Sequence, residues 1–181
     1  MKIFVTGDTH GKLEKVLKVF EKLKNIDLIL HKGDYYDDSR VLESILNVPV
    51  IGTRGNCDGS MSSSDFRIAQ TDYGNILVTH GHMQGVDYSP EKLLYLAQEN
   101  ECCAAVFGHT HIPYCESYDG IYLINPGSLT RPRDGSKGSY AVITTTESTF
   151  AASIIYYNNT FEKKPPKGGF VKGILNYSDR F

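Results

Sequence analysis

The sequence lacks any strong excess of charge of one sign. Its 181 residues include 19 lysines and arginines and 21 aspartates and glutamates, which gives a formal net charge of −2 at pH 7. Proteins that bind duplex nucleic acid or anionic membranes usually present a basic surface that supplies much of their affinity. We therefore expect neither partner, and an anionic substrate would have to be attracted by charges within a local site.

Long hydrophobic runs are also absent. No apolar stretch reaches the roughly 20 residues that a transmembrane helix needs. The first residues, Met1–Asp8, pass directly into a strand-like run that ends at a polar motif, which leaves no room for a signal peptide. These two absences predict a cytoplasmic protein.

Cysteines with the spacing of a redox or zinc motif are missing as well. The chain has Cys57, Cys102, Cys103 and Cys115, and no two of them are separated by two residues. Because Cys102 and Cys103 are adjacent, they would point to opposite faces of a strand. We therefore expect reduced thiols and no disulfides.

No repeat, low-complexity tract or long linker divides the chain, and its length suits a single core, so we predict one domain over residues 1–181. The first half alternates apolar runs with segments of helical periodicity. The apolar runs predict strands at Ile3–Thr6, Leu28–Leu30 and Pro49–Ile51, with a helix between each pair. This alternation predicts parallel strands that are covered by helices and carry ligands at their carboxyl ends.

The second half has the pattern of hairpins. Phe66–Thr71 and Ile76–Thr79 flank a turn sequence, and a helix with Ser89 as its N-cap and Pro90 at its first position leads to a strand at Ala104–Phe107. Four later segments predict a mostly antiparallel second sheet: Ile112–Tyr118, Ile121–Ile124, Tyr140–Thr145 and Phe150–Tyr157.

Together these segments predict an α/β (α+β) fold, in which two mixed sheets flanked by helices form a four-layer α-β-β-α sandwich. Beyond the last strand, Lys163–Gly169 has the composition of an exposed loop. The apolar residues of Phe170–Tyr177 predict either a segment that docks on the domain or a surface for a partner.

The most informative feature is a set of polar motifs that each follow an apolar run. They are Asp8-x-His10, Gly33-Asp34, Gly55-Asn56-Cys57-Asp58, His80 and Gly108-His109-x-His111. Any one motif is common by chance, but their joint occurrence indicates a metal site. Carboxylate, imidazole and amide donors suit borderline divalent ions, and two ions about 3.5–4 Å apart can hold both the attacking and the leaving oxygen of a phosphate ester.

The spacing of the motifs assigns a role to each donor. Asp8 and His10 are two residues apart and can hold one ion together, as can His109 and His111. Asp34 lies on a different strand from both pairs, and its two oxygens make it the natural bridge between two ions. Two divalent ions would leave the cluster at about +2, which attracts phosphate and lowers the pKa of a bound water enough to supply a hydroxide nucleophile.

The order of the motifs resembles that of the calcineurin-like metallophosphoesterases, whose pattern is D-x-H, GD, GNH[D/E], H and GHxH. Asn125-Pro126-Gly127-Ser128 and Pro132-Arg133 are similar to the small prokaryotic phosphodiesterase branch typified by YfcE, which shares its fold with the retromer scaffold subunit. The resemblance implies two divalent metal ions per chain, of which Mn²⁺ is the first expectation, with Ni²⁺, Zn²⁺ or Fe as further choices. It implies Asp8, His10, Asp34 and His111 on one ion, and Asp34, Asn56, His80 and His109 on the other.

Cys57 departs from the wider pattern, because much of the superfamily has there a histidine that contacts the phosphate and protonates the leaving oxygen. A thiol of pKa about 8.5 is a weaker acid than imidazolium, so activated esters should be favoured. We expect four catalytic residues at the reacting phosphate: Asn56, Cys57, Asp58 and His80. For Asp58, a role in orienting a ligand or carrying a proton and a role in capping a turn are both open.

Other residues near the motifs have a functional and a structural interpretation. We expect Asn56, Cys57 and Arg133 to meet the substrate, although Arg133 and Arg54 could equally pair with surface carboxylates. His80 is favoured over His82 as the ligand, and His31 is expected to be structural. The residues Tyr35, Tyr36 and Asp37 either line the pocket or cover an edge of the core.

These features predict a metal-dependent phosphodiesterase that acts on a small phosphodiester by attack of metal-bound hydroxide. The alternatives are a phosphomonoesterase of the same fold and a catalytically silent scaffold like the retromer subunit, which would have no reason to retain all seven metal ligands. A homo-oligomer is compatible with the sequence.

Overall fold

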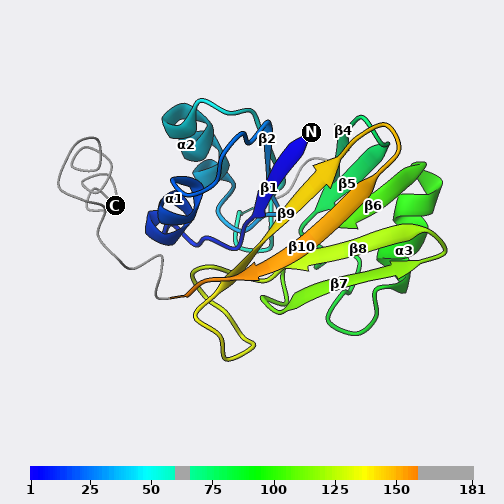
Figure 1. The fold of residues 1–181 in the computed structure, drawn as a ribbon. Coiled ribbons are helices and arrows are strands. Elements are labelled where there is room, and N and C mark those ends of the chain that lie inside the picture. Colours follow the sequence, from blue (N-terminus) through cyan, green and yellow to red (C-terminus); the bar gives the residue numbers. More distant parts are fainter. Residues whose placement is uncertain (60–65, 159–181) are drawn as a thin grey trace.

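The computed structural model describes residues 1–59 and 66–158 and contains two sheets that face each other (Figure 1). The first sheet has the strand order β10-β9-β1-β2-β3 and the second has the order β4-β5-β6-β8-β7. The segments Lys163–Gly169 and Phe170–Tyr177 lie outside the described residues.

The first sheet is built on the parallel strands β1 (Lys2–Thr6), β2 (Leu28–His31) and β3 (Val50–Gly52). Helices α1 (Glu14–Phe20) and α2 (Tyr36–Leu46) connect them. Side chains alternate between the two faces of a strand, so Ile3 and Val5 join the core between the sheets, whereas Phe4 packs with the helices. The predicted alternation of parallel strands and helices is confirmed.

The second sheet contains the hairpin β4 (Phe66–Gln70) and β5 (Asn75–Thr79), followed by β6 (Cys102–Val106), β7 (Pro113–Tyr118) and β8 (Ile121–Pro126). Strands β5, β6 and β8 are parallel to one another, and β4 and β7 are antiparallel to their neighbours. Helix α3 (Glu91–Glu99) covers the outer face. Its N-cap is Pro90, not Ser89, although the Ser89 hydroxyl accepts a hydrogen bond from the Glu91 N–H at 3.2 Å.

The last two strands were assigned to the wrong sheet by the sequence pattern. Strands β9 (Ser139–Thr145) and β10 (Phe150–Tyr156) form an antiparallel hairpin that joins the first sheet, where β9 pairs with β1 (Figure 1). Alternating burial is the same in either sheet, so it cannot identify the partner strand. Pairing beside β1 places Ala141 and Ile143 in the core between the sheets.

Three buried clusters hold the layers together. The first lies between the sheets, the second joins α1 and α2 to the first sheet, and the third joins α3 to the second sheet. Ile29, Leu42 and Leu93 are among the fully buried side chains, each of which stabilises the fold by about 1.5–3 kcal/mol relative to exposure. The fold is therefore the predicted four-layer α-β-β-α sandwich of two mixed sheets.

Two further expectations concern composition. All four cysteines are free thiols, as the spacing predicted. Among the described residues, no helix has both the length and the apolar character to cross a membrane.

Candidate metal centre

Parallel strands of both sheets end at one place, and the predicted ligands lie there. Asp8 follows β1, Asp34 follows β2, Asn56 follows β3, and His80 follows β5. His109 and His111 follow β6, so both sheets contribute donors to the same edge. All seven predicted metal ligands, which also include His10, are brought into one cluster of contacts.

Most of these ligands have an unusual backbone. The φ angles of Asp8, His10 and Asp34 are 49°, 50° and 49°, and those of His109 and His111 are 69° and 59°. A side chain other than glycine in this left-handed region costs about 1–3 kcal/mol, and such residues are enriched at functional sites. Five of the ten described non-glycine residues with a positive φ are therefore predicted ligands.

One group of donors surrounds His10 and His111. His10 Nε2 lies 3.5 Å from Asp34 Oδ2, and His111 Nε2 lies 3.8 Å from Asp8 Oδ2. Two donors that each bind one ion at about 2.1 Å are about 3.4 Å apart in tetrahedral geometry, so these separations suit an ion between them. Within the described residues, His10 Nε2 and Asp8 Oδ1 are buried without a hydrogen-bond partner.

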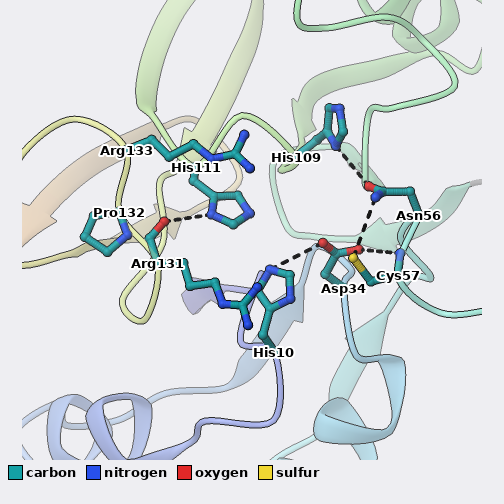
Figure 2. Close-up of a pocket in the computed structure, with 9 residues that line it drawn as sticks. All are labelled: His10, Asp34, Asn56, Cys57, His109, His111, Arg131, Pro132 and Arg133. Carbon is teal, nitrogen blue, oxygen red and sulfur yellow. Dashed lines mark hydrogen bonds and ion pairs between the residues drawn. The ribbon is translucent and has the colours of Figure 1, made fainter.

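A second group of donors surrounds Asn56 Oδ1, which lies 2.9 Å from His80 Nε2. The same oxygen lies 3.0 Å from His109 Nδ1 (Figure 2). His80 Nε2 also lies 3.5 Å from Asp34 Oδ1. Asp34 thus presents one oxygen to each group, which is the arrangement that a bridging carboxylate requires.

Oxygen acceptors fix the far nitrogen of three imidazoles. His80 Nδ1 donates to the Lys32 carbonyl oxygen at 3.0 Å, and His111 Nδ1 donates to the Arg131 carbonyl oxygen at 2.7 Å. His109 Nε2 lies 2.6 Å from Asp87 Oδ2. A neutral imidazole has one N–H, and His80 and His111 donate theirs to these carbonyl oxygens, so the nitrogen of each ring that faces the cluster is an acceptor. The acceptors His80 Nε2 and Asn56 Oδ1 therefore lie 2.9 Å apart, a contact that a cation beside them would make favourable.

The electrostatic environment favours the neutral form of His10, His80 and His111 and the ionised form of Asp8 near neutral pH. Burial lowers the pKa of His80 to about 4, and it also lowers the pKa of His10 and His111. Burial alone would raise the pKa of Asp8, but the adjacent Lys32 ammonium group opposes it, and that pKa lies below its usual value. Neutral imidazole and ionised carboxylate are the forms that bind metal ions.

A cavity of about 340 Å³ opens in front of these donors. Figure 2 shows Arg131 and Arg133 on one side of it, near His10 and His111, with Asn56 and Cys57 on the other. Arg133 was a predicted substrate contact, whereas Arg131 was missed. Its position in the same loop as Pro132-Arg133 was the signal that could have indicated it. The two guanidinium groups make the cavity suited to an anion.

The two residues after Asn56 differ in their placement. Cys57 lines the cavity, and its backbone N–H donates to Asp34 Oδ1 at 3.0 Å. Burial and the neighbouring Asp34 raise the pKa of the Cys57 thiol, which makes it a weaker acid. The Asp58 carboxylate accepts hydrogen bonds from the N–H groups of Tyr36 at 2.6 Å and Gly55 at 2.7 Å. This geometry favours the turn-capping role of Asp58.

The remaining candidates lie beside the cluster. His31 is fully buried on the helix side, where its Nε2 lies 3.1 Å from Thr9 Oγ1, as a structural histidine would. The His82 ring centre lies 5.2 Å from that of His80. The Tyr35 ring meets the His10 ring edge-on, with 5.5 Å between the ring centres. Arg54 Cζ lies 5.5 Å from the centre of the Tyr36 ring.

Besides Arg131, two charged residues of the site were missed by the sequence interpretation. The ammonium group of Lys32 forms a fully buried ion pair with Asp8 Oδ2. Asp87 belongs to the loop between β5 and α3, and no motif connects it with His109. The signal for Lys32 was a charged residue that directly continues a buried strand before Gly33-Asp34.

Comparisons with known proteins show that the chain is similar in sequence and fold to phosphoesterases. The probable metallophosphoesterase YsnB of Bacillus subtilis is 33% identical over 162 residues, which cover 87% of this chain and 91% of that protein. Phosphodiesterase YfcE of Escherichia coli K12 is 30% identical over 167 residues, which cover 79% of this chain and 87% of that protein. A crystal structure from Streptococcus pneumoniae, described as a predicted phosphoesterase, superposes with a TM-score of 0.73 at 26% identity and covers 92% of this chain and 93% of that one.

The family assignment covers most of the chain and includes every predicted metal ligand. Residues 1–148 match the family described as the calcineurin-like phosphoesterase superfamily domain. The relatives with matching sequences are named metallophosphoesterases and phosphodiesterases, and their coverage extends over both sheets. The chain therefore belongs to the calcineurin-like phosphoesterase superfamily.

Proposed function

We propose that this protein is a metal-dependent phosphodiesterase that hydrolyses a small phosphodiester at a site for two divalent ions. The observation that carries the proposal is the convergence of acceptor atoms in two groups that share Asp34. Asp8, His10, Asp34 and His111 would hold one ion. The other would be held by Asp34, Asn56, His80 and His109. When bound, the ions would activate a water molecule as the nucleophile and neutralise the charge of the phosphate.

The residues of the cavity would bind and orient the ester. Arg131 and Arg133 would contact non-bridging phosphate oxygens, because guanidinium groups match their geometry. Asn56 and Cys57 line the opposite wall and would border the reacting phosphate. With its raised pKa, the Cys57 thiol would be a poor proton donor to the leaving oxygen. This supports a preference for diesters whose leaving group needs little protonation.

The choice of metal follows from the donor set of four imidazoles, two carboxylates and one amide. This mixture suits borderline ions such as Mn²⁺, Zn²⁺ or Ni²⁺ better than Mg²⁺, which prefers oxygen ligands. We expect Mn²⁺ to support activity and Mg²⁺ to support little.

A metal-supplemented substrate screen tests the proposal. Protein stripped with EDTA is assayed with Mn²⁺ or Mg²⁺ on bis-p-nitrophenyl phosphate and on p-nitrophenyl phosphate, and bound metal is counted by elemental analysis. We expect Mn²⁺-dependent cleavage of the diester. Faster cleavage of the monoester would support the phosphomonoesterase alternative. A folded protein that binds no divalent ion would reject both enzyme assignments in favour of a scaffold.

A further inference from the structure

Lys32 is a fully buried cation in the middle of a site proposed to bind cations. Both its side chain and that of Asp8 have 0% exposure, and its ammonium group contacts Asp8 Oδ2. A lysine is almost never fully buried unless it is paired. The residue continues the alternation of β2, in which Leu30 faces the second sheet and His31 faces the helices, so Lys32 extends between the sheets beneath the donors.

The surrounding backbone leaves room for this side chain. A Cβ at Gly7 would collide with Lys32 Cγ, and a Cβ at Gly108 would lie 3.0 Å from Lys32 Nζ and 3.1 Å from Asp8 Oδ1. Both glycines directly precede predicted ligands, Asp8 and His109. The lysine therefore occupies a space that is built into the ligand loops.

The ammonium group directly contacts one of the two groups of donors, through Asp8. Of the seven proposed ligands, only Asp8 and Asp34 carry a negative charge, and Lys32 offsets one of the two. The Asp8 oxygen that it contacts, Oδ2, is also the oxygen that faces His111 Nε2 at 3.8 Å. An ion at Asp8 and His111 would share its carboxylate oxygen with a fixed positive charge. The Asn56 group does not include this oxygen.

We propose that Lys32 is a resident cation that makes the two metal positions unequal, so that the ion held by Asp34, Asn56, His80 and His109 binds tightly and the ion held by Asp8 and His111 binds weakly. This inference depends on the proposed two-ion function. It implies that the protein holds one ion when metal is scarce. The second ion then binds only as free metal rises, and the concentration of metal sets the active fraction.

A titration of EDTA-stripped protein with Mn²⁺ tests the inference, using calorimetry for affinity and electron paramagnetic resonance to distinguish single ions from coupled pairs. Wild type should bind two ions with dissociation constants at least tenfold apart. Lys32→Met should tighten the weaker step at least tenfold, because the repelling charge is gone. Lys12→Met removes the same charge from an exposed lysine outside the cluster and should leave both steps unchanged.

If Lys32→Met folds poorly, the melting temperatures of the variant and of wild type, each measured in EDTA and in Mn²⁺, still test the inference. Without metal the variant leaves Asp8 buried and unpaired, so it should melt below wild type in EDTA and gain more from Mn²⁺. If it folds only with metal, the rate of ion release to a chelator replaces the titration, and release should be at least tenfold slower than from wild type. Lys32→Gln, which is neutral but polar, should behave like Lys32→Met.

Two results would overturn this inference alone. A weaker second step in Lys32→Met would mean that the lysine positions Asp8 for the metal, and two equal steps in wild type would mean that the positions do not differ. Either could occur in an active two-metal enzyme, so the proposed function would stand. By contrast, folded wild type that binds no Mn²⁺ would overturn both proposals.

Discussion

Replacing Asp34 by asparagine should disrupt both proposed metal positions while preserving the fold. Its Oδ2 lies 3.5 Å from His10 Nε2 and its Oδ1 lies 3.5 Å from His80 Nε2. Oδ1 also accepts the Cys57 N–H at 3.0 Å. An asparagine oxygen can accept the same hydrogen bond, which leaves its NH₂ group to face His10. The variant therefore loses the negative charge that both ions would share, and it places N–H groups, which cannot bind a metal ion, where one ion would bind.

The magnitude follows from the role of the lost ligand. Removing a residue that only supports a metal ligand typically costs 10–100-fold in metal affinity, so loss of the shared ligand should cost at least about 100-fold for the ion beside His10. This factor corresponds to about 3 kcal/mol. The ion beside His80 should keep a neutral oxygen and weaken less. Turnover should fall at least about 100-fold, because the reaction is proposed to need both ions.

Elemental analysis, a Mn²⁺ titration and turnover of a nitrophenyl diester measure these effects together. Asp37→Asn makes the same change at an exposed aspartate three positions along the chain and serves as the control. It should bind metal and turn over like wild type. If Asp34→Asn retained two ions of normal affinity with near-normal turnover, the carboxylate would not bridge, and the shared-ligand reasoning would be wrong.

Three further predictions test individual residues. Hydrolysis rates of wild type should depend steeply on leaving-group pKa. Cys57→His should flatten this dependence and raise the rates of esters with poor leaving groups by up to about 10²–10⁴-fold. Equal slopes with intact metal content would mean that another group protonates the leaving oxygen. Asp87→Asn should lower the affinity for the ion at His109 by about 10–100-fold in a Mn²⁺ titration. An unchanged affinity would show that the 2.6 Å contact between His109 Nε2 and Asp87 Oδ2 does not support metal binding. Burial lowers the pKa of His31 from 6.5 to about 4. Between these two pH values the unfolded state binds a proton that the folded state does not. The free energy of unfolding therefore falls as the pH falls from 6.5 to about 4, by about 3 kcal/mol from this residue. Melting of EDTA-treated His31→Gln should therefore depend less steeply on pH than that of wild type, and equal slopes would contradict the assignment.

The sequence predicted the parts of the molecule that follow local rules. Apolar runs at strand spacing located the strands, and the parallel arrangement of β1, β2 and β3 implied that Asp8, Asp34 and Asn56 would converge. The pattern did not identify the sheet of β9 and β10, because register with β1 is a long-range property that alternating burial does not encode.

The missed charges follow from the same limit. Lys32 follows a short apolar run, and lysine in a sequence normally indicates an exposed position. Its burial depends on Gly7 and Gly108, which follow strands of different sheets. Asp87 and His109 are brought together only when β5 and β6 pair, so neither residue predicts the other locally. Metal-site motifs identify the donors, whereas their supporting partners emerge from the packing of distant segments.

The pairing of β9 with β1 also has a consequence for how the chain folds during synthesis. Lys2 pairs with Thr144 and Val5 pairs with Ala141, so one edge of β1 stays open until nearly the whole described chain has left the ribosome. Such non-local contacts raise the contact order and slow folding, and an exposed strand edge can pair with another chain in the meantime. Chains truncated before residue 139 would keep all the metal-site motifs but expose that edge of β1. Such chains are therefore expected to self-associate although no metal ligand is missing.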